Sequence, residues 1–129
     1  MALWTLKPPA GTTTREHGNS AEDAALAHLE GAGLRLIDRN YRTPGRGGGE
    51  IDLVMRGEGG TLVFVEVRAR TRAGHGGAAA SVSAVKQQRI VFAARHYLRR
   101  FRAPPPCRFD VVAIDAGRIE WLIGAFDAS

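Results

Sequence analysis

Residues 50–68 read EIDLVMRGEGGTLVFVEVR, and this stretch decides the fold. Two apolar runs of strand length, 50–56 and 62–68, flank a glycine-rich segment, which predicts an antiparallel β-hairpin. The run LVFV at residues 62–65 is apolar on both faces, as expected for a central strand of a sheet. Layers are therefore expected on both sides of this sheet.

Five further elements are predicted around the hairpin. They are a helix from Asn19 or Ser20 to Gly31 or Gly33, an edge strand over 34–40, a helix over 83–101, and strands over 108–114 and 119–123. In the edge strand, Leu34 and Leu36 are expected to point inward. The helix over 83–101 can cross between parallel strands. The order implies an α/β αβββαβ sandwich with a central mixed sheet, flanking helices and an extra C-terminal strand.

The chain is long enough for one domain with a buried core. It has 129 residues, of which 44% are hydrophobic. We expect a single domain over 19–129, preceded by a flexible tail over 1–18 that is rich in proline, glycine and threonine.

Cysteine content and hydropathy exclude several classes of protein. Cys107 is the only cysteine, so neither a disulfide within the chain nor a cysteine-based zinc site is expected. No apolar run approaches the length of a membrane span, and the first ten residues lack the apolar stretch of a signal peptide. We therefore expect a cytoplasmic protein without membrane association.

Positive charge is concentrated in one part of the chain. The formal net charge is +5, yet all 13 acidic residues lie outside residues 67–109, which hold ten of the 18 basic ones. This segment is expected to form a positive surface for an anionic partner. Sixteen of the basic residues are arginine, which reflects either phosphate recognition or the codon bias of a GC-rich genome.

Three acidic residues occupy positions that packing alone does not explain. Glu22 lies on or beside the apolar stripe of the first helix, whereas Asp52 and Glu66 lie within the two hairpin strands. A buried carboxylate is unfavourable unless it is paired or bound to a metal. A five-residue loop over 57–61 would place Asp52 opposite Glu66 on one face, whereas a four-residue loop would separate them.

Two facing carboxylates repel each other and favour a cation between them. Mg²⁺ or Mn²⁺ is the expected cofactor, with Asp52, Glu66 and the backbone carbonyl of Val67 as ligands. Arg68 points to the same face as Glu66 and is the candidate for orienting water or stabilising an anionic transition state. The alternative is a set of strand-end ion pairs, joining Asp52 to Arg68 or Arg70 and Glu66 to Arg42 or Arg46.

Contacts with nucleic acid are expected from the basic segment that follows Glu66. The candidate residues are Arg70, Arg72, Lys86, Gln87 and Arg89. Solvation is the alternative for Lys86 and Gln87, and a first-turn helical acid is the alternative for Glu22. The run GRGGG at residues 45–49 lacks the Lys-Ser/Thr of a P-loop, so it is interpreted as a flexible rim and not as a nucleotide site.

The order of the motifs resembles the YraN family, an uncharacterised bacterial family. The resemblance rests on Glu22 and on GEIDLV (49–54), FVEVRAR (64–70), VKQQRI (85–90) and RFDVV (108–112). That family is similar to the restriction-endonuclease-like superfamily, notably archaeal Holliday junction resolvases, whose sites use an acid on helix one, an Asp and a Glu-x-Lys. The resemblance implies a nuclease-like fold with catalytic residues at Glu22, Asp52 and Glu66, and it places the lysine position on Arg68.

The leading hypothesis is a metal-dependent endonuclease that hydrolyses DNA phosphodiesters, branched DNA included. DNA is expected rather than RNA, and a junction resolvase would need a homodimer with two active sites. One alternative is a non-catalytic nucleic-acid-binding module with a degenerate site, because arginine cannot shed a proton as lysine can. The other is a structural protein that binds an acidic partner.

Overall fold

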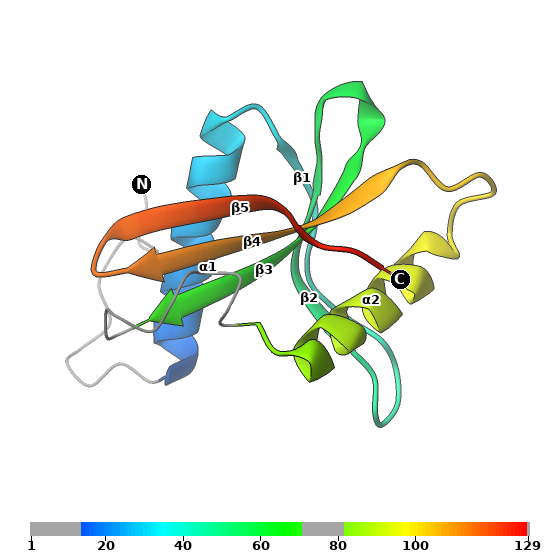
Figure 1. Ribbon diagram of the computed structural model, residues 1–129, viewed down its shortest axis with the longest axis horizontal. Coiled ribbons are helices and arrows are strands. Elements are labelled where there is room, and N and C mark those ends of the chain that lie inside the picture. The colour runs from blue at the N-terminus through cyan, green and yellow to red at the C-terminus, as the bar shows by residue number, and fades with distance from the viewer. Residues whose placement is uncertain (1–13, 71–81, 129) are drawn as a thin grey trace, which may run out of the picture.

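The computed structural model of the protein describes residues 14–70 and 82–128 (Figure 1). Its elements are helix α1 (Thr14–Gly31), strands β1 (Arg35–Arg42) and β2 (Glu50–Arg56), the 3₁₀ turn η2 (Glu58–Gly60), strand β3 (Leu62–Arg70), helix α2 (Ala84–Leu98), and strands β4 (Cys107–Asp115) and β5 (Arg118–Phe126).

The strands form one five-stranded sheet in the order β1-β2-β3-β4-β5. β3 and β4 run parallel and are joined through α2, whereas the other neighbours are antiparallel. This mixed sheet with two helices confirms the predicted αβββαβ sandwich with an extra C-terminal strand. In Figure 1, α1 lies behind the sheet and α2 lies in front of it.

The two faces of the sheet bury separate apolar cores. Residues of β3 alternate between them: Leu62 and Phe64 pack with α2, while Val63 and Val65 pack with α1. The α2 core contains rings in contact, with Phe64 stacked on Phe109 at 5.6 Å between centroids. A central strand with both faces covered explains why this run has no polar side until Glu66.

The hairpin adopts the register predicted from a five-residue loop. Arg56 pairs with Leu62 and Val54 with Phe64. At the opposite end of the sheet, Ala116 and Gly117 have φ values of 51° and 82°, which form the predicted turn between β4 and β5.

Two predictions about the first elements are wrong. α1 begins at Thr14, so residues 14–18, which were expected in the tail, are helical, and the helix does not begin at Asn19 or Ser20. Residues 1–13 lie outside the described part of the chain. Leu36 was expected to point inward but is 37% exposed, because a register shift between Leu36 and Asp38 interrupts the alternation of β1.

α2 follows the prediction closely. Ser83 caps it by accepting a hydrogen bond from the Lys86 N–H at 3.1 Å, and its buried residues include Ile90, Ala94 and Tyr97 at helical spacing. The helix ends at Leu98, three residues before the predicted end. In the described ranges, no helix combines the length and the apolar character needed to cross a membrane.

Candidate active site

Asp52 lies where β2 departs from β3. The regular pairing of these strands ends at Leu53 and Val65. Beyond this pair, the Val67 N–H donates to Asp52 Oδ2 at 2.8 Å, so a side chain replaces the backbone acceptor of the ladder. The charge of Glu66 acts on Asp52, so the predicted register brings these two acids close together.

Burial raises the pKa values of both carboxyl groups in this pair. Burial raises the pKa of Asp52 to about 7, with a further rise from the neighbouring Glu66 and an opposing effect of the Val67 N–H. Glu66 is 4% exposed, and burial raises its pKa too, although Lys86 and Arg68 act in the opposite direction. The pair therefore retains a proton close to neutral pH in the absence of a cation.

Two basic side chains from different elements reach the same oxygen of Glu66. Lys86 Nζ lies 3.5 Å from Glu66 Oε2, and an Arg68 guanidinium nitrogen lies 3.7 Å from it. Arg68 follows Glu66 on β3, as the sequence predicted. Lys86 comes from the first turn of α2, and its contact with Glu66 was not predicted, because it depends on where the crossover helix lies over β3.

Glu22 approaches the pair from α1 without joining it. Its side chain is 13% exposed, and its Oε1 lies 3.4 Å from Arg39 Nε. Burial raises the pKa of Glu22, and the charge of Asp52 raises it further, so the two carboxylates are electrostatic neighbours. Among the described residues, no three acidic, histidine or cysteine side chains converge as metal ligands.

The backbone of β1 is irregular beside these acids. Asn40 lies between Arg39, which pairs with Leu53, and Tyr41, which pairs with Ile51. It has a φ of 55°. Asparagine tolerates this left-handed conformation better than most residues. The Asn40 amide lies within hydrogen-bonding distance of Glu22, so this kink helps to position an acid from another layer.

The ion pairs proposed as the alternative to a metal site are different in the structure. Arg42 pairs with Glu50 at 3.5 Å and not with Glu66. Asp52 has no ion pair within the described ranges, where its partners are an N–H group and another acid. Arg72 and the side chain of Arg70 lie outside those ranges, so their predicted roles stay predictions.

The donor set fits a hard divalent cation. Mg²⁺ binds through one or two carboxylates and keeps several waters, and Asp52 and Glu66 supply two carboxylates at one point. Val67 is held there by its N–H bond to Asp52. Its carbonyl stays a predicted ligand.

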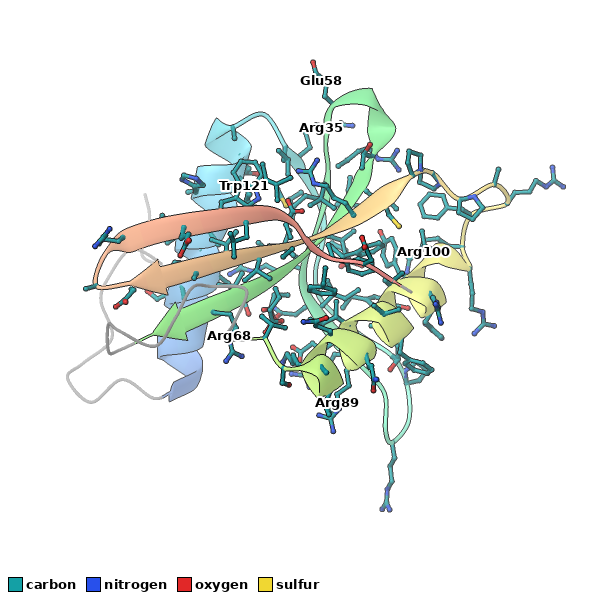
Figure 2. All side chains as sticks on the ribbon, viewed as in Figure 1. Arg35, Glu58, Arg68, Arg89, Arg100 and Trp121 are labelled. Atoms are coloured by element: carbon teal, nitrogen blue, oxygen red, sulfur yellow. The ribbon has the colours of Figure 1, made fainter. Side chains whose placement is uncertain are left out.

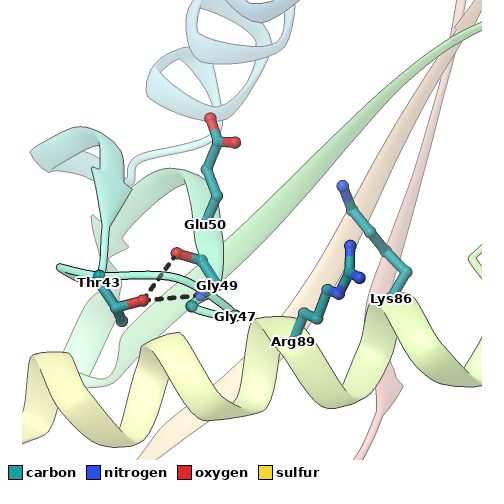
Figure 3. Close-up of a pocket in the computed structure, with 8 residues that line it drawn as sticks. Thr43, Gly47, Gly49, Glu50, Lys86 and Arg89 are labelled. Carbon is teal, nitrogen blue, oxygen red and sulfur yellow. Dashed lines mark hydrogen bonds between the residues drawn. The ribbon is translucent and has the colours of Figure 1, made fainter.

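Of the other predicted contacts, Lys86 and Arg89 line a pocket of about 320 Å³ beside the pair, together with residues of the loop that precedes β2 (Figure 3). Arg68 and Arg89 both project into the lower part of the view in Figure 2. Gln87 instead donates from Nε2 to the Val82 carbonyl at 3.1 Å, so its amide is engaged within the chain.

A second strand aspartate, Asp110 on β4, was missed as an anchor. Its carboxylate is fully buried and accepts hydrogen bonds from Arg108 Nε at 3.0 Å, from Trp121 Nε1 at 2.9 Å and from the Gly124 N–H at 2.9 Å. An aspartate inside the apolar run FDVV was the available signal. Trp121 on β5 is thus part of this buried hydrogen-bond network.

Comparison with known proteins decides the family. A family-level sequence match spans residues 21–114 and corresponds to "Uncharacterised protein family UPF0102". The chain belongs to the UPF0102 family. It is 63% identical over 128 residues to a UPF0102 protein of Albidiferax ferrireducens, covering 99% of both chains. It is also 65% identical over 117 residues to a UPF0102 protein of Paracidovorax citrulli, covering 91% of this chain and 87% of the relative.

These matches confirm the expected membership of an uncharacterised bacterial family. The UPF0102 match includes Glu22, Asp52, Glu66 and Lys86, together with all of α2 and the part of α1 from residue 21 onward.

Proposed function

We propose that this UPF0102 protein is a metal-dependent endonuclease with a nuclease-like fold, which hydrolyses DNA phosphodiesters at Asp52 and Glu66. The observation that carries the proposal is the carboxylate pair itself, in which the pKa of Asp52 is raised to about 7 next to the buried Glu66. Such a pair is unfavourable as an isolated structural feature and becomes favourable around a divalent cation. A bound Mg²⁺ or Mn²⁺ would activate water and neutralise charge developing on the phosphodiester.

The basic residues around Glu66 are proposed to bind a phosphate oxygen or a water molecule. Lys86 and Arg68 bring two positive charges within 4 Å of one carboxylate oxygen, Glu66 Oε2. Lysine is a compact cation with three donors, which suits it to a water or a phosphate oxygen in a crowded site. We assign the role of the lysine in the Glu-x-Lys pattern to Lys86, because position 68 holds arginine.

A plasmid-nicking assay tests this proposal. Wild type, Asp52→Asn plus Glu66→Gln, Arg68→Lys and Lys86→Ala are incubated with supercoiled plasmid and with a four-way junction in Mg²⁺ or Mn²⁺. We expect cleavage by wild type, none by the double carboxylate variant, and a loss of about 10²-fold for Lys86→Ala, comparable to removing one transition-state donor. Arg102→Ala, at the exposed end of the loop after α2, is the control and is expected to cut as wild type does.

The second candidate is a nucleic-acid-binding module with a degenerate site, and the presence of arginine at position 68 favours it. Activity gained only in Arg68→Lys would establish this candidate. Wild type that cuts no better than the double carboxylate variant would remove the nuclease proposal for these substrates. Binding that does not weaken with salt would instead favour a structural protein with a protein partner.

The proposal also includes DNA in preference to RNA, a cytoplasmic location, and a homodimer if branched DNA is the substrate. Two strands of a junction require two active sites, so the dimer is tested by sedimentation with and without junction DNA. A 1:1 complex that cuts both strands would contradict the dimer.

A further inference from the structure

The pocket beside the carboxylate pair is a feature that the proposed reaction does not use. It lies between the loop that joins β1 to β2 and the beginning of α2, and Lys86 belongs both to its lining and to the contact with Glu66 (Figure 3). Its other lining residues are Thr43, Gly45, Gly47, Gly48, Gly49, Glu50 and Arg89. Glycine therefore forms most of one wall, and basic side chains form the other.

The glycine wall is built on one buried threonine. Thr43 is 8% exposed, its Oγ1 accepts a hydrogen bond from the Gly49 N–H at 2.8 Å, and its own N–H donates to the Gly49 carbonyl at 3.0 Å. These bonds close the loop at its base. The run GRGGG, which was interpreted as a flexible rim, lies in a loop whose base is joined by hydrogen bonds between residues 43 and 49.

The loop lies directly against the backbone of α2. A Cβ atom on Gly49 would lie 2.0 Å from the Arg89 carbonyl oxygen, and one on Gly48 would lie 1.9 Å from Thr43 Oγ1. Only glycine at position 49 permits this approach to α2, whereas the contact at position 48 is within the loop itself. The backbone of the loop is thereby brought to the turn of α2 that carries Arg89.

Charge in the pocket is mainly positive. Lys86 and Arg89 are three residues apart on α2, so they share a face of the helix, and Figure 3 shows their side chains rising side by side. Arg89 is exposed and makes no ion pair with any residue that the structure describes. Glu50 is the acidic lining residue, and it pairs with Arg42 at 3.5 Å, which offsets its charge.

We propose that this pocket binds a backbone phosphate of the nucleic acid, next to the phosphate at the carboxylate pair. The inference rests on the proposed function and specifies how its substrate is held. An arginine fork matches phosphate oxygens, and N–H groups of glycine-rich loops favour anions. Because Lys86 reaches both the pocket and Glu66, a strand with one phosphate in the pocket would carry its next phosphate toward the carboxylates.

The test measures binding without cleavage. Fluorescence anisotropy of labelled duplex DNA is recorded in EDTA at several potassium chloride concentrations for wild type, Arg89→Ala and the control Arg102→Ala. One lost phosphate contact lowers the slope of log K against log salt by about 0.9. We expect that decrease and weaker binding for Arg89→Ala only, while Arg89→Lys retains the slope because it retains the charge. Equal slopes for Arg89→Ala and Arg102→Ala would overturn the inference.

Two competitors distinguish other occupants. Inorganic phosphate at constant ionic strength is expected to leave DNA binding unchanged, because a single free ion lacks the neighbouring contacts. If it displaces DNA from wild type but not from Arg89→Ala, the pocket is a free-anion site and the inference is wrong. Polyglutamate is the second competitor. If it binds more tightly than DNA and this binding depends on Arg89, the pocket binds an acidic protein and the inference is wrong.

Failure of this inference can be separated from failure of the proposed function. A decreased slope for Arg89→Ala, together with no metal-dependent cleavage by wild type, removes the nuclease proposal and retains the phosphate pocket. Cleavage that depends on Asp52 and Glu66, together with unchanged slopes, removes the pocket and retains the nuclease.

Discussion

Asp110 and Asp52 are aspartates within strands of one sheet, yet their surroundings differ. Asp110 receives donors from Arg108, Trp121 and Gly124, so every direction around its buried carboxylate is satisfied. Asp52 receives one backbone N–H and faces another acid, Glu66. The first arrangement is complete within the chain, whereas the second is complete only with a proton or a cation. We therefore interpret Asp110 as a structural anchor and Asp52 as part of a candidate site.

The largest expected effect is the loss of stability when Asp110, the buried anchor, is replaced. Asp110→Ala would leave the Trp121 and Gly124 N–H groups and the Arg108 charge without their acceptor inside the fold. We expect a loss of about 3–5 kcal/mol in the free energy of unfolding, measured by urea denaturation. Asp127→Ala changes an exposed aspartate and is expected to have little effect. A loss no greater than that of the control would show that Asp110 is not an anchor.

Asp52→Asn is expected to increase the free energy of unfolding, in contrast to Asp110→Ala. The pKa of Asp52 is raised to about 7 in the folded protein, so its stabilising contribution is complete below the unfolded value of 3.8 and is lost as pH rises toward 7. The asparagine variant does not titrate. Its advantage over wild type should therefore grow by about 2 kcal/mol between pH 5 and pH 7, in metal-free buffer.

Urea denaturation across this pH range measures the difference, with Asp127→Asn as the exposed control. An advantage that stays constant between pH 5 and pH 7 would contradict the raised pKa. An advantage that falls with pH would mean that Asp52 is stabilised as a carboxylate, like an anchor.

The smallest expected effect concerns the loop beside the site. Thr43→Val removes the hydroxyl that accepts the Gly49 N–H and leaves that N–H unsatisfied, at a cost of about 1–2 kcal/mol. Thr43→Ser keeps the hydroxyl and is expected to lose less. If serine and valine are equally destabilising in thermal unfolding, the methyl group of Thr43 stabilises the loop and the hydrogen bond does not.

The sequence predicted those features that depend on local pattern. Loop length set the pairing of Arg56 with Leu62 and so brought Asp52 to Glu66. Helical spacing identified the buried face of α2, and the apolar run of β3 identified the centre of the sheet. These features need only neighbouring residues and the geometry of strands and helices.

The remaining features depend on how elements meet. The contact between Lys86 and Glu66 requires the position of α2 over β3, which depends on how that helix packs and not on a local sequence pattern. Two donors of Asp110, Trp121 and Gly124, come from β5, where the pairing with β4 shifts register between Phe109 and Val111. The register shift that exposes Leu36 likewise follows from pairing with β2, so alternation along β1 alone gave the wrong face.

The central claim is that Asp52 and Glu66 form a divalent cation site. Isothermal titration calorimetry of wild type and Asp52→Asn with Mg²⁺ at about pH 8 tests it most directly, repeated near pH 5.5, where protons compete for the carboxylates. We predict binding by wild type at the higher pH, much weaker binding at the lower pH, and none by Asp52→Asn. Equal binding by the two proteins, or no binding by wild type at the higher pH, would contradict the claim.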